Sequence, residues 1–444
     1  MTETDLFGTP DVEFLYRLMD VPSVSPLEGG EARQTARAQR LFAEGAQARG
    51  FRLLLAGPPG AEVLDGPEVP AAVRDLLGGD PGLLATQPSV VVAMGAPDAP
   101  ANRRLVVNFH MDTVGPHVPP RIADGVLSGR GAVDDKGPGV AALCGVAAAF
   151  AQEPRIAEAI EVRVCSVPGE EGGAMGSFGT RWLTSLGHVG RLMLFAEPTG
   201  QTFMDLSTAT MTLRVTVDGE DSTDDHPEQG HNATVALGFL ATRLAGELGR
   251  FATVHGARAT VAGLHTGSSH NRVYGTGQLL LNIAYPDSGT GALMHQRVTE
   301  ILGAAGAAFR AGHADNPLTR RLAADWDRVV RADWLKQGLP TLANRDPAME
   351  AVLRHAGLRR HSLEADGAPF TCDAIWAGAA GRYVAVCGPG RLDRNGAHTD
   401  REHVALADLA AYADAVRRIV LRFAETVGPR PSPATDRVLS EETT

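Results

Sequence analysis

Histidines and carboxylates stand beside several short apolar runs of this sequence, where they could act together on a metal ion. The set consists of His110 and Asp112 after residues 104–109, Asp134 before residues 138–151, Glu170 and Glu171 after 160–167, Glu197 after 191–196, and His398 after 383–387. Each motif alone is more often a chance match or a solvated turn. Their joint placement beside separate predicted strands indicates a single site, because the parallel strands of a sheet end at the same edge.

The residue types in this set favour a pair of divalent metal ions. Buried carboxylates that gather at one edge repel one another unless a cation neutralises them. Two imidazoles and three carboxylates form a mixed nitrogen and oxygen ligand set that suits zinc, with cobalt or manganese as alternatives. One carboxylate can bridge two metals, and the remaining acid of the pair Glu170 and Glu171 is then free to act as a general base. The pattern predicts the cocatalytic centre of a hydrolase.

The elements that must position these side chains are short strands separated by helices. Strands are predicted over residues 89–94, 105–109, 160–167, 192–196 and 383–386, and helices over 138–151 and 178–186. We therefore expect an α/β fold built on a mixed, largely parallel sheet that helices cover on both faces.

The middle of the chain has a different pattern. Strands are predicted over residues 208–217, 257–264, 278–285 and 325–332, and helices over 231–248 and 291–309. This order is that of a ferredoxin-like α+β unit. A chain of 444 residues is also too long for one ordinary core. We therefore expect a catalytic domain of residues 1–204 and 341–444, interrupted by an inserted domain of residues 205–340.

Composition excludes some classes of partner. Lys plus Arg number 41 against 52 Asp plus Glu, so the formal net charge is −11, and lysine occurs only at Lys136 and Lys336. A binder of nucleic acid or of anionic membranes needs a basic face, so neither partner is expected. The four cysteines are scattered and the first residues carry no signal-peptide pattern, which favours a cytoplasmic protein.

In order along the chain, these segments resemble the motifs of the dinuclear zinc aminoacylase, acetylornithine deacetylase, succinyl-diaminopimelate desuccinylase and glutamate carboxypeptidase superfamily. The resemblance covers nearly the whole chain and implies a zinc-peptidase-like catalytic domain with an inserted lid that forms a homodimer. It implies the following roles: His110 and Glu197 as ligands of one zinc, Glu171 and His398 as ligands of the other, Asp134 as the bridge, Asp112 as the residue that orients His110, Glu170 as the general base, and Asn271 and Gly390 as substrate contacts. A non-proline cis peptide is expected after Asp134.

The lid departs from the pattern of the superfamily at two positions. Thr223 stands where relatives have a histidine that reaches across the dimer to stabilise the oxyanion, and Ala284 stands where relatives have an arginine that binds the substrate carboxylate. An oxyanion donor is typically worth about 3–4 kcal/mol of the activation barrier. Four histidines could replace the missing one in space, although each is more often an ordinary surface or loop residue: His226, His231, His265 and His270. We therefore expect a specialised amidase whose substrate lacks the usual carboxylate or is held by other groups.

Three functions remain open at this point. The leading hypothesis is a metal-dependent hydrolase of an amide or peptide bond in a small molecule, similar to a deacylase, an aminoacylase or a carboxypeptidase. A second hypothesis keeps the metals but forms or transfers amides, or cyclises a substrate, in a biosynthetic pathway. A third is a non-catalytic metalloprotein, against which the presence of Glu170 speaks, since this residue is not expected to be a ligand. The acyl group, the amine and the native metal are not predicted.

Overall fold

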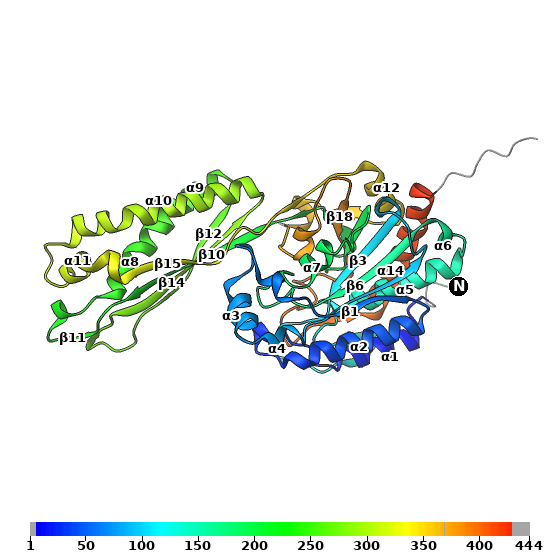
Figure 1. The fold of residues 1–444 in the computed structure, drawn as a ribbon, viewed down its shortest axis with the longest axis horizontal. Coiled ribbons are helices and arrows are strands. Elements are labelled where there is room, and N and C mark those ends of the chain that lie inside the picture. Colours follow the sequence, from blue (N-terminus) through cyan, green and yellow to red (C-terminus); the bar gives the residue numbers. More distant parts are fainter. Residues whose placement is uncertain (1–5, 368, 429–444) are drawn as a thin grey trace, which may run out of the picture.

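The computed structural model describes residues 6–367 and 369–428, and these residues form two lobes that lie end to end (Figure 1). The larger lobe is built on a six-stranded sheet and the smaller lobe on a four-stranded sheet. The chain enters the smaller lobe after residue 208 and leaves it after residue 336. The domain boundaries expected at 204/205 and 340/341 stay a prediction.

The six-stranded sheet has the order β1-β2-β6-β3-β7-β18. Its strands are β1 (Arg52–Gly57), β2 (Ser89–Gly95), β3 (Arg104–His110), β6 (Glu161–Val167), β7 (Leu192–Phe195) and β18 (Tyr383–Val386). Neighbours among β6, β3, β7 and β18 are parallel, whereas β2 runs antiparallel to both β1 and β6. The expected mixed, largely parallel sheet is confirmed, and the nearly continuous burial of β3 is typical of a strand covered on both faces.

Helices pack on both faces of this sheet. One face is covered by α1 (Thr9–Met19), α2 (Ala32–Ala48), α5 (Lys136–Gln152), α12 (Pro347–His355) and α14 (Leu406–Val427). The other face packs against α7 (Thr180–Ser185) and a short 3-10 helix, Asp373–Trp376. Helix α5 approaches α14 closely, because a Cβ atom on Gly145 would lie 2.3 Å from the carbonyl oxygen of Ala413. The small residues of α5 therefore allow the helix layer to close over the sheet.

The smaller lobe is an antiparallel sheet of β10 (Ala209–Asp218), β12 (Arg258–His265), β14 (Thr276–Tyr285) and β15 (Val330–Lys336), in the order β12-β14-β10-β15. Helices α8 (Ala233–Arg243), α9 (Gly249–Val254), α10 (Ser288–His313) and α11 (Arg320–Val329) lie on one side of this sheet (Figure 1). The strand order is that of the expected ferredoxin-like unit. We call this lobe the lid.

One sequence prediction in the lid was wrong. The segment 325–332 was expected to be a strand, but α11 extends to Val329 and β15 begins only at Val330. The buried residues Leu322, Trp326 and Val329 recur at helical spacing against the lid core, and this periodicity outweighs the short apolar run.

The lid packs directly against the catalytic lobe. Met175 and Ile375 of the catalytic lobe belong to the same buried cluster as Met211 of the lid and Leu339 of the connection that follows β15. The indole nitrogen of Trp376 also donates a hydrogen bond of 2.6 Å to the carbonyl oxygen of Met175. The loop that carries Met175 is therefore part of the junction between the lobes.

The remaining elements are short. They are α3 (Ala71–Gly79), α4 (Pro81–Leu84), α6 (Ile156–Ala159), α13 (Leu363–Asp366), β4 (Arg121–Ala123), β5 (Val126–Ser128), β8 (Thr202–Phe203), β9 (Leu206–Ser207), β11 (Ser222–Thr223), β13 (Arg272–Val273), β16 (Leu342–Ala343), β17 (Arg359–Arg360) and β19 (His403–Ala405). Among the helices of the described ranges, none is long and apolar enough to cross a membrane.

Candidate metal centre

The carboxyl edge of the six-stranded sheet brings the predicted ligands together. His110 is the last residue of β3, Glu170 and Glu171 follow β6, and Glu197 follows β7. The loop after β18 leads to His398. Four groups of potential ligand atoms each lie within 4.8 Å of one another: His110 with Asp135 and Glu197, His110 with Glu170 and Glu171, Asp134 with Glu171 and His398, and Glu197 with Cys372 and Asp373.

The carboxylate of Asp134 lies between the two histidines. Its Oδ1 atom is 2.9 Å from Nε2 of His110, and its Oδ2 atom is 3.2 Å from Nε2 of His398. Glu171 approaches the same nitrogen of His398 at 3.3 Å, and Glu197 approaches Nε2 of His110 at 3.9 Å. The two oxygens of one carboxylate thus face two different groups of ligand atoms, as a bridging ligand must.

Asp112 holds the turn that carries the two glutamates. Its carboxylate accepts hydrogen bonds from the backbone amides of Glu170, at 3.3 Å, and Glu171, at 3.1 Å. The ring of His110 contacts Asp112 through the backbone, since Nδ1 lies 2.8 Å from the carbonyl oxygen and 3.8 Å from the carboxylate. Asp112 was expected to orient His110. In the structure, its carboxylate lies closer to the backbone amides of Glu170 and Glu171 than to the ring of His110.

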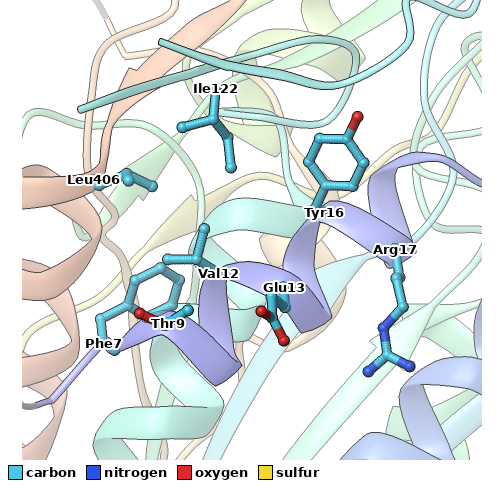
Figure 2. A pocket seen from close by; sticks show the side chains of 9 residues that line it. Phe7, Thr9, Val12, Glu13, Tyr16, Arg17, Ile122 and Leu406 are labelled. Carbon is cyan, nitrogen blue, oxygen red and sulfur yellow. The ribbon is translucent and has the colours of Figure 1, made fainter. Parts of the chain in front are cut away.

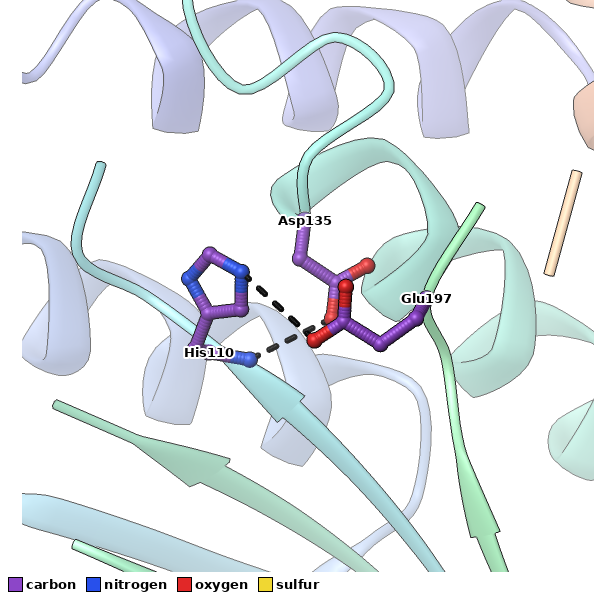
Figure 3. Close-up of side chains that lie close together, drawn as sticks. All are labelled: His110, Asp135 and Glu197. Carbon is purple, nitrogen blue, oxygen red and sulfur yellow. Dashed lines mark hydrogen bonds and ion pairs between the residues drawn. The ribbon is translucent and has the colours of Figure 1, made fainter. Parts of the chain in front are cut away.

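Asp135 was not among the predicted site residues. It follows Asp134 through a non-proline cis peptide bond, which the resemblance to the superfamily implies, and its side chain points toward His110 and Glu197 (Figure 3). The backbone amide of His110 donates to Oδ2 of Asp135 at 3.3 Å. The adjacent acidic pair Asp134–Asp135 was the available sequence signal, but spacing alone does not show which acid faces which histidine.

Glu402 is a second residue that the sequence analysis missed. This buried carboxylate accepts hydrogen bonds from the backbone amides of Gly131, at 2.9 Å, and of Val133 and Asp134, both at 3.2 Å. Its other oxygen accepts a hydrogen bond of 2.6 Å from the buried guanidinium of Arg130. Glu402 comes four positions after His398, so it ties the loop of one histidine to the segment that carries Asp134.

The electrostatics of the cluster fit a cation. Burial raises the pKa of Glu197, and the charge of Asp134 raises it further. Burial and the neighbouring Glu171 raise the pKa of Glu170 in the same way. Hydrogen bonds to Asp134 and Glu171 raise the pKa of His398 to about 10. The cluster thus contains five carboxyl groups and two imidazole rings. A buried set of ligands with this excess of negative charge suits divalent ions.

Of the three lid residues singled out from the sequence, Thr223 and Asn271 are exposed and Ala284 is half-buried. Thr223 is exposed in β11, where it pairs with Arg272, and Asn271 is exposed beside β13. Ala284 is half-buried in β14, directly opposite Arg258 of β12. In the described part of the chain, neither Asn271 nor Thr223 makes a side-chain hydrogen bond to a residue of the metal centre.

The four lid histidines differ in their surroundings. His231 is buried, and its ring accepts a hydrogen bond of 2.9 Å from the amide of Glu220 and lies 2.9 Å from Asp325. It is therefore held within the lid. His226, His265 and His270 are exposed.

Gly390, in the loop after β18, has a positive φ of 65°. A Cβ atom at this position would lie 2.5 Å from Cγ2 of Val133. Only glycine suits this turn, which packs against the segment that carries Asp134.

Side chains of α1 and its surroundings line a cavity of about 860 Å³ (Figure 2). It is lined by α1 residues, including Val12 and Tyr16, together with Phe7, Ile122 and Leu406. None of its lining residues belongs to the ligand cluster. We assign it no role.

A mixed sheet with this ligand cluster at its carboxyl edge, and an inserted lid beside it, defines a metallopeptidase-type hydrolase. The chain belongs to the family described as Peptidase family M20/M25/M40, whose model matches residues 106–422. It is accordingly a metal-dependent hydrolase that acts on an amide or peptide bond.

Three similar proteins illustrate the relationship. A putative LysW-lysine/LysW-ornithine hydrolase of Aeropyrum pernix is 26% identical over 305 residues, covering 68% of this chain and 76% of the relative. The M20 family metallo-carboxypeptidase Sso-CP2 of Sulfolobus solfataricus has a TM-score of 0.66 at 12% identity, covering 94% of this chain and 100% of that one. The YXEP protein of Bacillus subtilis, a dinuclear metal binding peptidase of the same family, has a TM-score of 0.59 at 11% identity, covering 95% and 100%.

Proposed function

We propose that this chain hydrolyses an amide bond with two divalent ions, of which zinc is the first candidate and cobalt or manganese the alternatives. One ion is assigned to His110 and Glu197, the other to Glu171 and His398, with Asp134 shared between them. The observation that carries this proposal is that the two oxygens of Asp134 lie 2.9 and 3.2 Å from two different histidines. The dinuclear description of the Bacillus subtilis relative supports the stoichiometry.

Glu170 is assigned the role of general base. Metal ions at such a centre polarise the substrate carbonyl and lower the pKa of a bound water. Burial and Glu171 raise the pKa of the Glu170 carboxyl, which suits a group that must accept a proton and then release it. Glu170 takes the proton from the attacking water and delivers it to the leaving nitrogen. Asp112 keeps the base in position through the two amides it binds.

The proposed substrate is a small molecule in which an amide joins an acyl group to an amino acid. The name of the Aeropyrum pernix relative, a putative LysW-lysine/LysW-ornithine hydrolase, supports an amino acid as one part of the substrate. Aminoacylase, deacetylase and carboxypeptidase activities are the candidates within it. Thr223 and Ala284 favour a substrate that is recognised differently from those of the superfamily members that carry histidine and arginine there.

Two further expectations belong to this proposal. We propose that the protein is a homodimer formed through the lid, because β12 is an edge strand whose free side can pair with a second chain. Light scattering coupled to size-exclusion chromatography tests the dimer. Cytoplasmic location, without nucleic-acid or membrane partners, stays a prediction from composition.

Amide formation, cyclisation or acyl transfer remains the second candidate function. It is favoured by Thr223, since the position of the usual oxyanion donor carries no imidazole. Mass spectrometry of the products, with and without an added amine acceptor, separates this reaction from hydrolysis.

The decisive experiment combines metal analysis with an activity panel. We expect two tightly bound divalent ions per chain, loss of activity in chelator, and recovery when zinc, cobalt or manganese is added back. The substrate panel consists of N-acyl-amino acids and dipeptides, assayed with each metal. Purified folded protein that binds no divalent ion, even after add-back, would overturn the proposal.

A further inference from the structure

Lys336 is the last residue of β15, where the chain leaves the lid for the catalytic lobe. It is one of the two lysines in the sequence. The other, Lys136, is buried, and its ammonium donates to the carbonyl oxygens of Leu18 and Val21 at 3.1 and 2.9 Å. Lys336, by contrast, is only partly buried, and within residues 6–367 and 369–428 no side-chain hydrogen bond or ion pair engages its ammonium.

The strand register places Lys336 on the face of the lid sheet that the helices leave open. Lys336 lies opposite Thr212 of β10, which in turn lies opposite Asn282 of β14. Residues directly opposite one another in antiparallel strands project to the same face. In β10 the residues on the other face, such as Met211 and Leu213, are buried in the lid core, whereas Thr212 is not. Lys336, Thr212 and Asn282 therefore form a polar row on the open face.

The connection that follows Lys336 packs against the loop of the general base. Leu339, three residues after Lys336, shares a buried cluster with Met175. Met175 lies in the turn after Glu170, and its amide donates a hydrogen bond of 3.0 Å to the carbonyl oxygen of Glu170. Burial lowers the pKa of Lys336, and the Glu170 carboxylate acts in the opposite direction. Among the described residues, no hydrogen bond or ion pair joins this ammonium to Glu170.

Other cations of the open face are less suited to the same role. Arg214 lies two residues further along β10 than Thr212 and is paired with Asp333, at 2.9 Å. Arg258 is exposed on the edge strand β12, opposite Ala284. Lys336 combines partial burial, an unengaged ammonium and a place at the start of the connection that packs against the loop of the general base.

We propose that Lys336 binds a carboxylate of the substrate at the junction between the lid and the catalytic lobe. This inference rests on the proposed function. It adds that the substrate carries a negative charge next to the amide bond that is cleaved. Relatives bind the substrate carboxylate with an arginine at the position of Ala284. In this chain, the ammonium of Lys336 binds the carboxylate instead.

The first test compares acids with their neutral counterparts. Wild-type protein and the variant Lys336→Met are assayed on N-acyl-amino acids and on the matching N-acyl-amino acid carboxamides. We expect KM for the acids to rise about 10- to 100-fold, the range for loss of one charge-assisted hydrogen bond, with a smaller change in kcat. KM for the carboxamides stays unchanged, and Lys336→Arg restores part of the binding of the acids.

Two further variants complete this test. Arg214→Gln is the matched control, because it removes a paired cation from the same face, and it leaves both substrate classes unaffected. Arg258→Gln tests the competing assignment. If Arg258→Gln, rather than Lys336→Met, raises KM selectively for the acids, the proposal is wrong.

The second test does not depend on turnover. Acetic anhydride labels exposed amines, and mass spectrometry of peptides shows how far Lys336 is modified. We expect N-acyl-amino acids to protect Lys336 and the carboxamides to leave it reactive. Equal labelling with both would refute the carboxylate site, even if the protein proves to be an amidase. Selective protection without turnover would uphold the site while the proposed hydrolysis fails.

Discussion

The backbone amide of Asp134 donates a hydrogen bond of 3.2 Å to the buried carboxylate of Glu402. Asp134, whose carboxylate faces both His110 and His398, is therefore held by Glu402, which lies in the loop that carries His398. The same carboxylate oxygen accepts from Gly131 and Val133, and Arg130 balances its charge. This contact links the two halves of the metal centre before any ion binds.

Replacing Glu402 with glutamine should therefore weaken both folding and metal binding. The amide removes the charge that three backbone donors and Arg130 share, at a cost of about 2–4 kcal/mol in the free energy of unfolding. Calorimetry in chelator measures the stability of the metal-free protein, and isothermal titration measures metal affinity. The matched control is Glu425→Gln, at an exposed residue paired with Arg422, which should change stability by less than about 1 kcal/mol. Equal metal affinity in Glu402→Gln and wild type would contradict the role given to Glu402.

Glu170 and Glu171 are adjacent but should behave differently when changed to glutamine. Glu170→Gln removes the base, so we expect kcat to fall about 10²- to 10⁴-fold while two ions remain bound. Glu171→Gln removes a ligand and should release one ion. Elemental analysis beside steady-state kinetics distinguishes the two cases. Loss of metal from Glu170→Gln would show that this residue is a ligand instead.

The bridging role of Asp134 predicts a difference in metal stoichiometry. Asp134→Ala removes an oxygen from both ion positions, so both ions should bind more weakly. His398→Ala removes a ligand from one position only, and we expect one ion to be retained at His110. Titration of the metal-free variants with zinc gives the number of sites. If Asp134→Ala retains one ion at wild-type affinity, the carboxylate is not shared.

Stability should depend on pH through His188, which lies in the catalytic lobe away from the ligand cluster. Burial, followed by the charge of Arg163, lowers the pKa of His188 to about 4. The unfolded chain has a histidine pKa of about 6.5, so between pH 6.5 and 4 it binds a proton that the folded protein does not. The stability that neutral His188 contributes is therefore complete above pH 6.5 and declines as the pH falls toward 4. We expect a smaller decline in His188→Asn, measured by urea unfolding at pH 7 and pH 4.5. His355→Asn, at an exposed histidine, is the control, and equal declines in all three proteins would contradict the assignment.

The clustering of the candidate ligands could be predicted because several of them stand at the ends of strands. His110 ends β3 and Glu197 follows β7, so the topology of the sheet brings them together once its order is known. The presence of a buried strand is a local property that hydrophobic patterns indicate well, and a polar residue directly after the apolar run marks the edge of the sheet. The strands of the lid were also predicted from the sequence, except that residues 325–329 form the end of α11 rather than the start of a strand.

The residues that were missed depend on contacts between distant parts of the chain. Glu402 binds amides more than 260 residues away in sequence, and no periodicity or spacing signals such a contact. The role of Lys336 depends on the register between β15 and β10 and on the packing of the lid against the catalytic lobe. The alternation of polar and apolar residues in β10 indicates which side chains of that strand share a face. It does not indicate which residue of a distant strand lies opposite each of them.

The packing of Met175 into the lid core joins two parts of the molecule that could otherwise move separately. A hinge motion that swings the smaller lobe outward must either carry the Glu170 turn with it or pull Met175 out of its apolar contacts. In the first case the base leaves the attacking water, and in the second case apolar surface is exposed to solvent. In the first case, separating the lobes also removes the base from the attacking water, so an enzyme held half open in that way should be inactive.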